Sequence, residues 1–451
     1  MGEPPIWTDD PELEAAAEAE RAKARTEANG HAGPADEWPV MAKEAFHGPA
    51  GEIAQTIEPH TESDTVFLLI NLHVFFGNAV GRGPYYAVEG TRHYPNLFAL
   101  FSGPTSKGRK GTGDNRARQV FSVAEPGWCA DRIKGCLSSG EGLIWEVRDR
   151  ITKMVKDGKS ANRIEEVVDD GVADKRLLIV QSEFSGALQA MRRDGSLLSS
   201  VMRDAWDRGD LGTLVKHSPA RATGAHISII GHITDAELRQ LFDRTSMANG
   251  FGNRLLFARA RRSKVLPFGG KLSSDAICEM GNKVALAIMR ARAIGEVTWS
   301  DDGAAGWEAI YEKLSEGRPG LFGALTSRAE AQVVRLALNY ALWDGVDRIG
   351  LDHLMAAQAV WKYCETSARQ IFGDRLGDPI ADTILTALKN AGTTGLTRTD
   401  ISGLFSKNAS AGQIALGLQE LANLRLATMK REPGNGAGRP TEFWAYGAGH
   451  R

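Results

Sequence analysis

This sequence has few cysteines, no long apolar run and no large excess of charge of either sign. Four cysteines occur in 451 residues and none forms a CxxC pair, which argues against a disulfide scaffold and a cysteine-based zinc site. No apolar run approaches the roughly 18 residues of a membrane span. The longest, residues 66–80, is interrupted by Asn71, His73 and Asn78 and predicts a buried helix. The formal net charge is −2, so any nucleic-acid surface must be local.

Composition divides the chain into four parts. Residues 1–40 hold ten acids and three bases and predict a solvated acidic arm, with a docking segment as the alternative. This start lacks the basic stretch and apolar core of a secretory signal, so we expect a cytoplasmic protein without membrane contact. Residues 41–267 alternate apolar strands with helix-length segments, and 268–375 show helical periodicity that predicts a lid. Residues 379–451 predict three helices and a hairpin, the order of a winged helix.

The most informative stretch is an apolar strand that runs into a Gly-rich turn and then a helix. Residues 97–101 are apolar, and residues 103–112 read Gly-Pro-Thr-Ser-Lys-Gly-Arg-Lys-Gly-Thr. Small residues let backbone N–H groups face phosphate oxygens, a Lys reaches the terminal phosphates, and a hydroxyl holds the metal. The spacing departs from the strict P-loop, and a basic surface turn is the alternative. The predicted nucleotide-binding residues are Gly103, Thr105, Lys107, Gly108, Lys110, Gly111 and Thr112.

Two further apolar strands end in polar residues that suit the same chemistry. Residues 175–181 lead to Glu183, and a carboxylate at a strand end can hold Mg²⁺ or orient the attacking water. Residues 226–234 end with His232 and Thr234, which are suited to sensing a γ-phosphate. Three such strands, separated by helix-length sequence, predict a parallel sheet with one active edge. For each segment alone, a buried strand with ordinary polar residues at its end is the alternative.

Arg254 is the residue that we expect to stabilise the negative charge that develops during phosphoryl transfer. It follows the Gly-rich turn at 250–252, and an Arg presented by a stiff turn can offer a bidentate fork to a phosphate of the same or a neighbouring subunit. A surface Arg paired with an acid is the alternative.

Basic side chains gather near the C-terminus. Residues 379–451 hold eight bases and five acids, and a basic recognition helix and wing would contact DNA phosphates. Protein docking is the alternative for such a domain. The predicted DNA-binding residues are Arg398, Lys407, Lys430, Arg431 and Arg439.

Several of these motifs, in this order, resemble a family of RecA-like P-loop ATPases from bacteria, plasmids and phages that is associated with primase and helicase functions. The resemblance covers residues from about 66 to 375 and rests on the segments 96–112, 138–145, 180–184, 223–234 and 250–254. It implies a RecA-like core that binds ATP and Mg²⁺, homo-oligomers such as a hexameric ring, and a primase partner. It assigns the phosphate contact to Lys110, with Lys107 as the alternative, and the metal contacts to Thr112 and Glu183.

The sequence therefore predicts an α/β protein with a RecA-like P-loop core, a helical lid and a C-terminal winged helix. Its expected function is an ATP-dependent action on DNA, as a helicase, translocase or loader in the replication of a mobile element or phage. Glu183, His232 and Arg254 are the predicted catalytic residues. Two alternatives remain: a DNA-binding initiator or regulator that does not hydrolyse ATP, and an ATPase component of an anti-phage system.

Overall fold

The computed structural model describes most of the chain, with gaps at several loops. The described residues are 38–103, 110–156, 163–213, 221–242, 250–318, 320–373, 376–406, 408–432 and 441–447. Contacts divide the chain into Met1–Val40 and Met41–Arg451, and every helix and strand named below belongs to the second unit. The acidic segment 1–37 and the predicted site residues Thr105, Lys107, Gly108, Lys407 and Arg439 lie outside the described residues.

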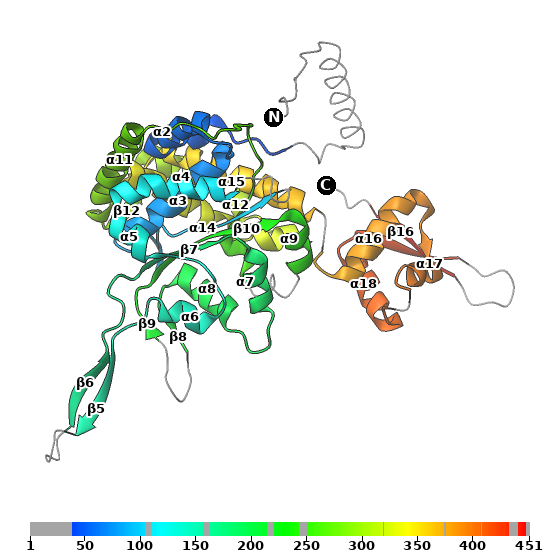
Figure 1. The fold of residues 1–451 in the computed structure, drawn as a ribbon. Helices are drawn as coiled ribbons and strands as arrows, with labels where there is room; N and C mark the ends of the chain where they lie inside the picture. The colour runs from blue at the N-terminus through cyan, green and yellow to red at the C-terminus, as the bar shows by residue number, and fades with distance from the viewer. Residues whose placement is uncertain are drawn as a thin grey trace, which may run out of the picture. The chain divides into compact units, whose positions relative to one another are not determined.

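A five-stranded, all-parallel sheet forms the centre of the second unit (Figure 1). Its spatial order is β11-β3-β10-β7-β4. The strands are β3 (Phe98–Gly103), β4 (Ile133–Lys134), β7 (Arg176–Gln181), β10 (His226–Thr234) and β11 (Leu255–Arg259). The whole of β3 is buried, as expected for a strand covered on both faces. The predicted α/β fold with a parallel sheet is therefore confirmed, and it is compatible with a Rossmann-like core.

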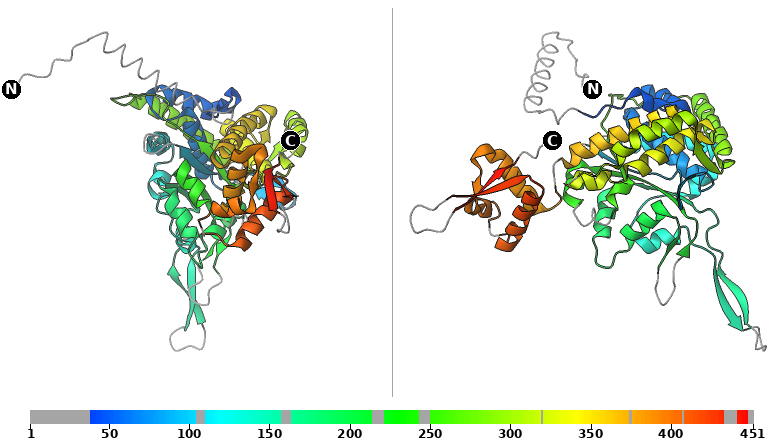
Figure 2. Two further views of the ribbon diagram at one scale, coloured as in Figure 1. Left: turned by 90° about the vertical axis from the view of Figure 1, so that its right-hand side faces the viewer. Right: turned by 180° about the vertical axis from the view of Figure 1, so that it is seen from behind.

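Successive side chains of β3 enter two separate hydrophobic cores. Ala99 and Phe101 pack into one core, whereas Phe98 and Leu100 pack into the other, because side chains alternate across a strand. Figures 1 and 2 show the helices that cover the two faces. The first core includes α3 (Thr65–Val80), α4 (Lys110–Ala124), α11 (Ser274–Arg292) and α14 (Ala329–Asp344). The second includes α6 (Gly140–Trp145), α7 (Phe184–Met191), α8 (Leu198–Asp207) and α9 (Asp235–Leu241).

Helix α3 is buried around its whole circumference, as its apolar sequence predicts. Every residue from Val66 to Val80 is buried, and the Asp64 carboxylate caps the first turn by accepting a hydrogen bond from Val66 N. Its Asn78 side chain donates to the Leu177 carbonyl at 3.0 Å and accepts from Trp128 Nε1 at 3.1 Å. Polar groups that interrupt the apolar run thus anchor α3 to the sheet, since a buried amide needs partners.

The helical region that follows β11 packs as part of the main body. Helix α14 and α15 (Leu351–Phe372) share the first core with α3. The region also contains α12 (Asp301–Ser315), α13 (Gly320–Thr326) and two short strands, β12 (Glu296–Trp299) and β13 (Arg348–Ile349). These strands join β1 (Tyr85–Val88) and β2 (Thr91–His93) in a second sheet, with the order β13-β12-β1-β2. The segment predicted as a helical lid thus packs against the first core.

The last part of the described chain contains the predicted three helices and hairpin. The helices are α16 (Pro379–Ala391), α17 (Arg398–Gly403) and α18 (Ala411–Asn423). The strands β14 (Leu396–Thr397), β15 (Ala427–Glu432) and β16 (Thr441–Tyr446) form an antiparallel sheet in the order β14-β16-β15. These elements enclose a separate hydrophobic core. Within the described residues, no helix combines the length and the apolar character that a bilayer crossing requires.

Candidate active site

The carboxyl ends of three adjacent parallel strands bring the described nucleotide-site candidates, apart from Arg254, to one edge of the central sheet. Thr234 at the end of β10 pairs with Gly103 at the end of β3, and Gly231 pairs with Gln181 at the end of β7. Glu183 lies two residues after the end of β7 and directly before α7, and it is exposed. In open α/β sheets this edge is where ligands bind.

Helix α4 begins at this edge and is held there by close packing. It starts at Lys110, so Gly111 and Thr112 lie in its first turn, where backbone N–H groups lack helical partners and favour anions. Gly113 packs against α3, where a Cβ atom would lie 2.2 Å from Phe67 Cδ1. At the end of β3, a Cβ on Gly103 would lie 2.1 Å from the Ala260 carbonyl oxygen. Both glycines therefore permit backbone approaches that no other residue allows.

Replacing Gly113 by Ala is expected to lower the free energy of unfolding by about 1–3 kcal/mol, because the added methyl group overpacks the contact between α3 and α4. Urea denaturation measures the change. Gly111→Ala in the same helix is the control, because nothing lies within 4 Å of a Cβ at that position. It should leave stability unchanged or raise it by up to about 1 kcal/mol. Equal effects of the two substitutions would contradict the packing argument.

His232 is bound to helix α4 through an acid that sequence reasoning missed. Its side chain is 4% exposed, and its Nε2 atom lies 2.8 Å from Asp114 Oδ2. Asn71 of α3 donates to the other carboxylate oxygen of Asp114 at 3.1 Å. Phe67 and Phe101 flank the His232 ring, with centroids 5.4 and 6.0 Å away. The signal for Asp114 was an acid near the start of the helix that follows the Gly-rich segment.

Thr234, by contrast, has a structural role. Its hydroxyl donates to Glu237 Oε2 at 2.8 Å and accepts from Glu237 N at 3.1 Å. These contacts form a capping box at the start of α9. The Thr234 hydroxyl thus makes its hydrogen bonds within α9. Of the two polar residues at the end of β10, His232 is the one that contacts α4.

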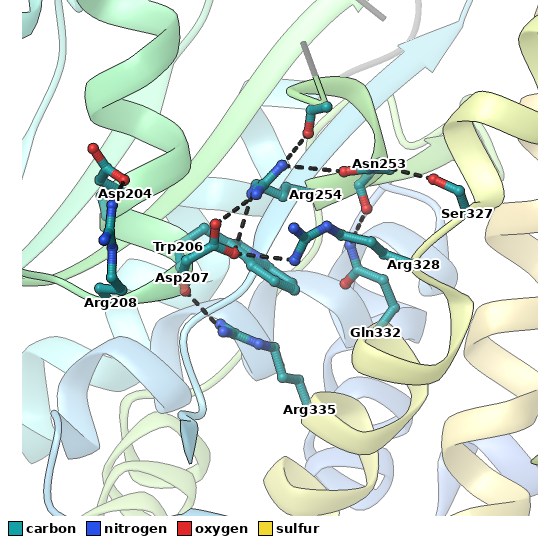
Figure 3. Close-up of polar contacts among 12 residues, drawn as sticks. Asp204, Trp206, Asp207, Arg208, Asn253, Arg254, Ser327, Arg328, Gln332 and Arg335 are labelled. Atoms are coloured by element: carbon teal, nitrogen blue, oxygen red, sulfur yellow. Dashed lines mark hydrogen bonds and ion pairs between the residues drawn. The ribbon is translucent and has the colours of Figure 1, made fainter. Parts of the chain in front are cut away.

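The structure does not bring Arg254 to the other candidate residues. Arg254 directly precedes β11, and Leu255 pairs with Phe98 at the start of β3, so Arg254 lies at the amino edge of the sheet. Its side chain is 5% exposed and binds Asp207 Oδ2 at 2.5 Å, as Figure 3 shows. The structure thus gives Arg254 an acid partner within the chain, as the alternative interpretation expected. The pair differs from that expectation because Arg254 is buried and does not lie on the surface.

Arg254 belongs to a cluster of three guanidinium groups around one carboxylate and one indole ring (Figure 3). Arg328 Nη1 also binds Asp207, at 3.1 Å. Arg335 lies 3.6 Å from the centroid of the Trp206 ring and donates to the Trp206 carbonyl at 2.8 Å. Burial lowers the pKa of Arg335 to about 9 and also lowers the pKa of Arg328. Both shifts indicate that positive charge is costly here, and Asp207 is the carboxylate that offsets it.

The described DNA-binding candidates lie on two sides of the C-terminal hairpin. Arg398 donates to the Ala411 carbonyl at 3.0 Å, and Arg431 Nη2 lies 3.6 Å from Glu442 Oε1. Lys430 is exposed. Because side chains alternate along a strand, Lys430 points to the opposite face of β15 from Arg431.

One group within the described residues has the composition of a metal site, namely His47, Asp344 and His353. Both imidazole Nε2 atoms lie close to Asp344 Oδ2, at 2.9 Å for His47 and 3.0 Å for His353. The backbone N–H of Gly350 donates to His353 Nδ1 at 3.0 Å. His353 therefore carries its proton on Nε2 and donates it to Asp344, whereas a metal would need the Nε2 lone pair. This group, which we call the clamp, joins His47, the residue before the helix Gly48–Ile57, to the helices α14 and α15 by hydrogen bonds.

These hydrogen bonds predict that the free energy of unfolding falls at acid pH. Burial would raise the pKa of Asp344, but hydrogen bonds from His353 and His47 outweigh it and hold the pKa below 3.8. Because the folded pKa is depressed, the stabilisation is complete above the unfolded pKa of about 3.9 and is lost as pH falls through the folded pKa. We expect Asp344→Asn to cost about 1.5–3 kcal/mol at pH 7 and less near pH 3. Urea midpoints at both pH values measure this, and a cost independent of pH would contradict it.

Comparison of the sequence with protein-family models gives no match. Comparison with curated proteins gives no match either.

Proposed function

We propose that this chain is a Mg²⁺-dependent ATPase of the RecA-like P-loop type that acts on DNA. The observation that carries the proposal is one sheet edge at which a buried strand, the start of the next described helix and an exposed carboxylate meet. The strand is β3, the helix is α4, and the carboxylate is Glu183 just after β7, two strands away. His232 lies on β10 between them.

Residues at this edge suit ATP and Mg²⁺. Backbone N–H groups in the first turn of α4 favour phosphate oxygens, and a close backbone approach at Gly103 leaves no room for a side chain. Lys110 would hold the terminal phosphates, and Thr112 and Glu183 would hold Mg²⁺, which neutralises developing charge when it is bound. Glu183 would orient the attacking water. His232, paired with Asp114, would respond to the γ-phosphate.

Arg254 is not part of the proposed site within one subunit. A role across a subunit boundary would require Arg254 to leave Asp207, so that Asp207 would keep its ion pair with Arg328 but lose its shorter one.

DNA is the proposed partner because of local charge. Residues 379–451 carry eight bases and five acids, and the exposed Lys430 is a candidate phosphate contact. The three helices and the antiparallel hairpin support a winged helix. From the family resemblance we propose that the protein is a helicase, translocase or loader that assembles as a homo-oligomeric ring. It would work beside a primase in the replication of a mobile element or phage.

The test is Mg²⁺-dependent ATP hydrolysis with and without single-stranded and duplex DNA. We expect turnover that DNA stimulates, and we expect Lys110→Ala to abolish it. Lys271→Ala removes an exposed lysine elsewhere and should retain the wild-type rate. If wild-type protein binds DNA without turnover, the initiator or regulator function replaces the ATPase proposal.

A further inference from the structure

A groove in the C-terminal domain lies between α18 and the β15–β16 hairpin. Its volume is about 970 Å³, which is within the range of pockets that hold ligands. Its apolar lining consists of Ala415, Leu418, Ala422, Met429 and Trp444. The other lining residues are polar or charged, among them Thr397, Arg398 and Gln419. The groove is therefore large enough to receive side chains of another molecule, with an apolar floor and a polar rim.

Helix α18, one wall of the groove, is poorly suited to DNA. Its 13 residues include no Lys and no Arg, and Glu420 is its only charged residue. Leu416 on the same helix is 72% exposed. A recognition helix in a DNA groove needs donors for phosphates and base edges, whereas exposed apolar side chains favour a protein surface.

Trp444 provides a second, independent indication of a ligand. Its side chain lines the groove and is 8% exposed. Its indole Nε1 is buried and has no hydrogen-bond partner among the described residues. A buried donor without an acceptor costs about 1–3 kcal/mol, and Trp at interfaces usually finds its acceptor on the partner. An incoming carbonyl or carboxylate oxygen would satisfy this N–H group.

The charges at the groove favour an acidic partner. Arg398 and Arg431 line it together with a single acid, Glu442. Arg431 and Glu442 are 3.6 Å apart, with side-chain exposures of 66% and 36%, so their pairing is weak. Lys430, the candidate DNA contact, points to the opposite face of β15, because neighbouring residues in a strand alternate. Two of the DNA-binding candidates, Arg398 and Arg431, thus belong to the groove, whereas Lys430 lies on a separate surface.

We propose that this groove docks an acidic segment of a partner protein. An apolar side chain of the segment would pack between Leu418 and Met429, an oxygen acceptor would bind Trp444 Nε1, and carboxylates would face Arg398 and Arg431. The proposal does not depend on ATP hydrolysis.

The experiment follows the Trp444 resonance in the full chain labelled with 5-fluorotryptophan. The chain has ten tryptophans, and Trp444→Phe identifies the resonance. The probes are an amphipathic peptide with Leu on one face and Glu on the other, its counterpart with Lys in place of Glu, and a DNA duplex. We expect a saturable shift with the acidic peptide and no shift with the other two.

A second variant keeps the proposal testable if Trp444→Phe folds poorly. Ala422 is exposed on α18 and lines the groove, so Ala422→Trp should fill it without disturbing the core and should weaken peptide binding at least tenfold. Lys430→Ala, on the opposite face, should not change it. A Trp444 shift with DNA would make the groove a nucleic-acid surface and overturn the proposal, as would the absence of a shift with every probe.

Discussion

Replacing Glu183 by Gln is expected to lower the rate of ATP hydrolysis by about 10²–10⁴-fold, the usual contribution of a general base. Glu183 is exposed at the carboxyl edge of the sheet, two residues after the end of β7. An amide of the same shape can neither accept the proton of the attacking water nor neutralise Mg²⁺. The substitution should not disturb folding, because no described side-chain hydrogen bond caps α7 from this position.

Two measurements separate this role from a structural one. Binding of a fluorescent ATP analogue, measured without Mg²⁺, should change little in Glu183→Gln, since the carboxylate is assigned to the metal and the attacking water and not to the nucleotide. Glu141→Gln is the matched control, because Glu141 is also an exposed acid at a helix start, in the first turn of α6. Wild-type turnover in Glu183→Gln would show that Glu183 is an ordinary residue before a helix.

Asp207→Asn is expected to destabilise the protein by about 3–5 kcal/mol, the cost of leaving a buried charge without its partner. Asp207 binds both Arg254 and Arg328, and Arg335 lies beside them against Trp206. The substitution would leave three guanidinium groups around one indole ring with no carboxylate in contact. The urea denaturation midpoint measures the loss.

Asp204→Asn is the control on the same helix. Asp204 binds Arg208, whose side chain is 71% exposed, so its loss should cost well under 1 kcal/mol. A further test adds Arg328→Gln to Asp207→Asn. Removal of one excess charge should recover part of the lost stability, whereas additive losses would indicate that the cluster is not held by charge balance.

The strands of the central sheet were predictable because buried parallel strands read as continuous apolar runs. The segments that form β3, β7 and β10 are such runs. The position of Glu183 just after one of them was therefore predictable too. The partner of Arg254 was not predictable, because Asp207 lies 47 residues away. Its tie to Arg254 forms only when α8 packs against the sheet. The same limit applies to His232 and Asp114, which meet only when β10 pairs with β3, the strand that precedes α4.

The helical region after residue 268 shows what periodicity leaves open. Helical spacing predicts α14 and α15 but does not tell which surface each one covers. Both helices bury their apolar sides in the core that contains α3, and a role of this region as a lid stays a prediction. The phosphate-loop assignment stays a prediction, because Thr105, Lys107 and Gly108 lie outside the described residues.

The complete burial of α3 has a consequence for the way this molecule opens. A helix enclosed on every side has no solvent-facing half that could fray while the rest stays folded. Its amide hydrogens should exchange with deuterated solvent only when the whole packed unit unfolds. The Asn78 bonds to the Leu177 and His226 carbonyls couple the helix to two strands at once. The slowest-exchanging amides of α3 therefore report the global stability of this protein directly.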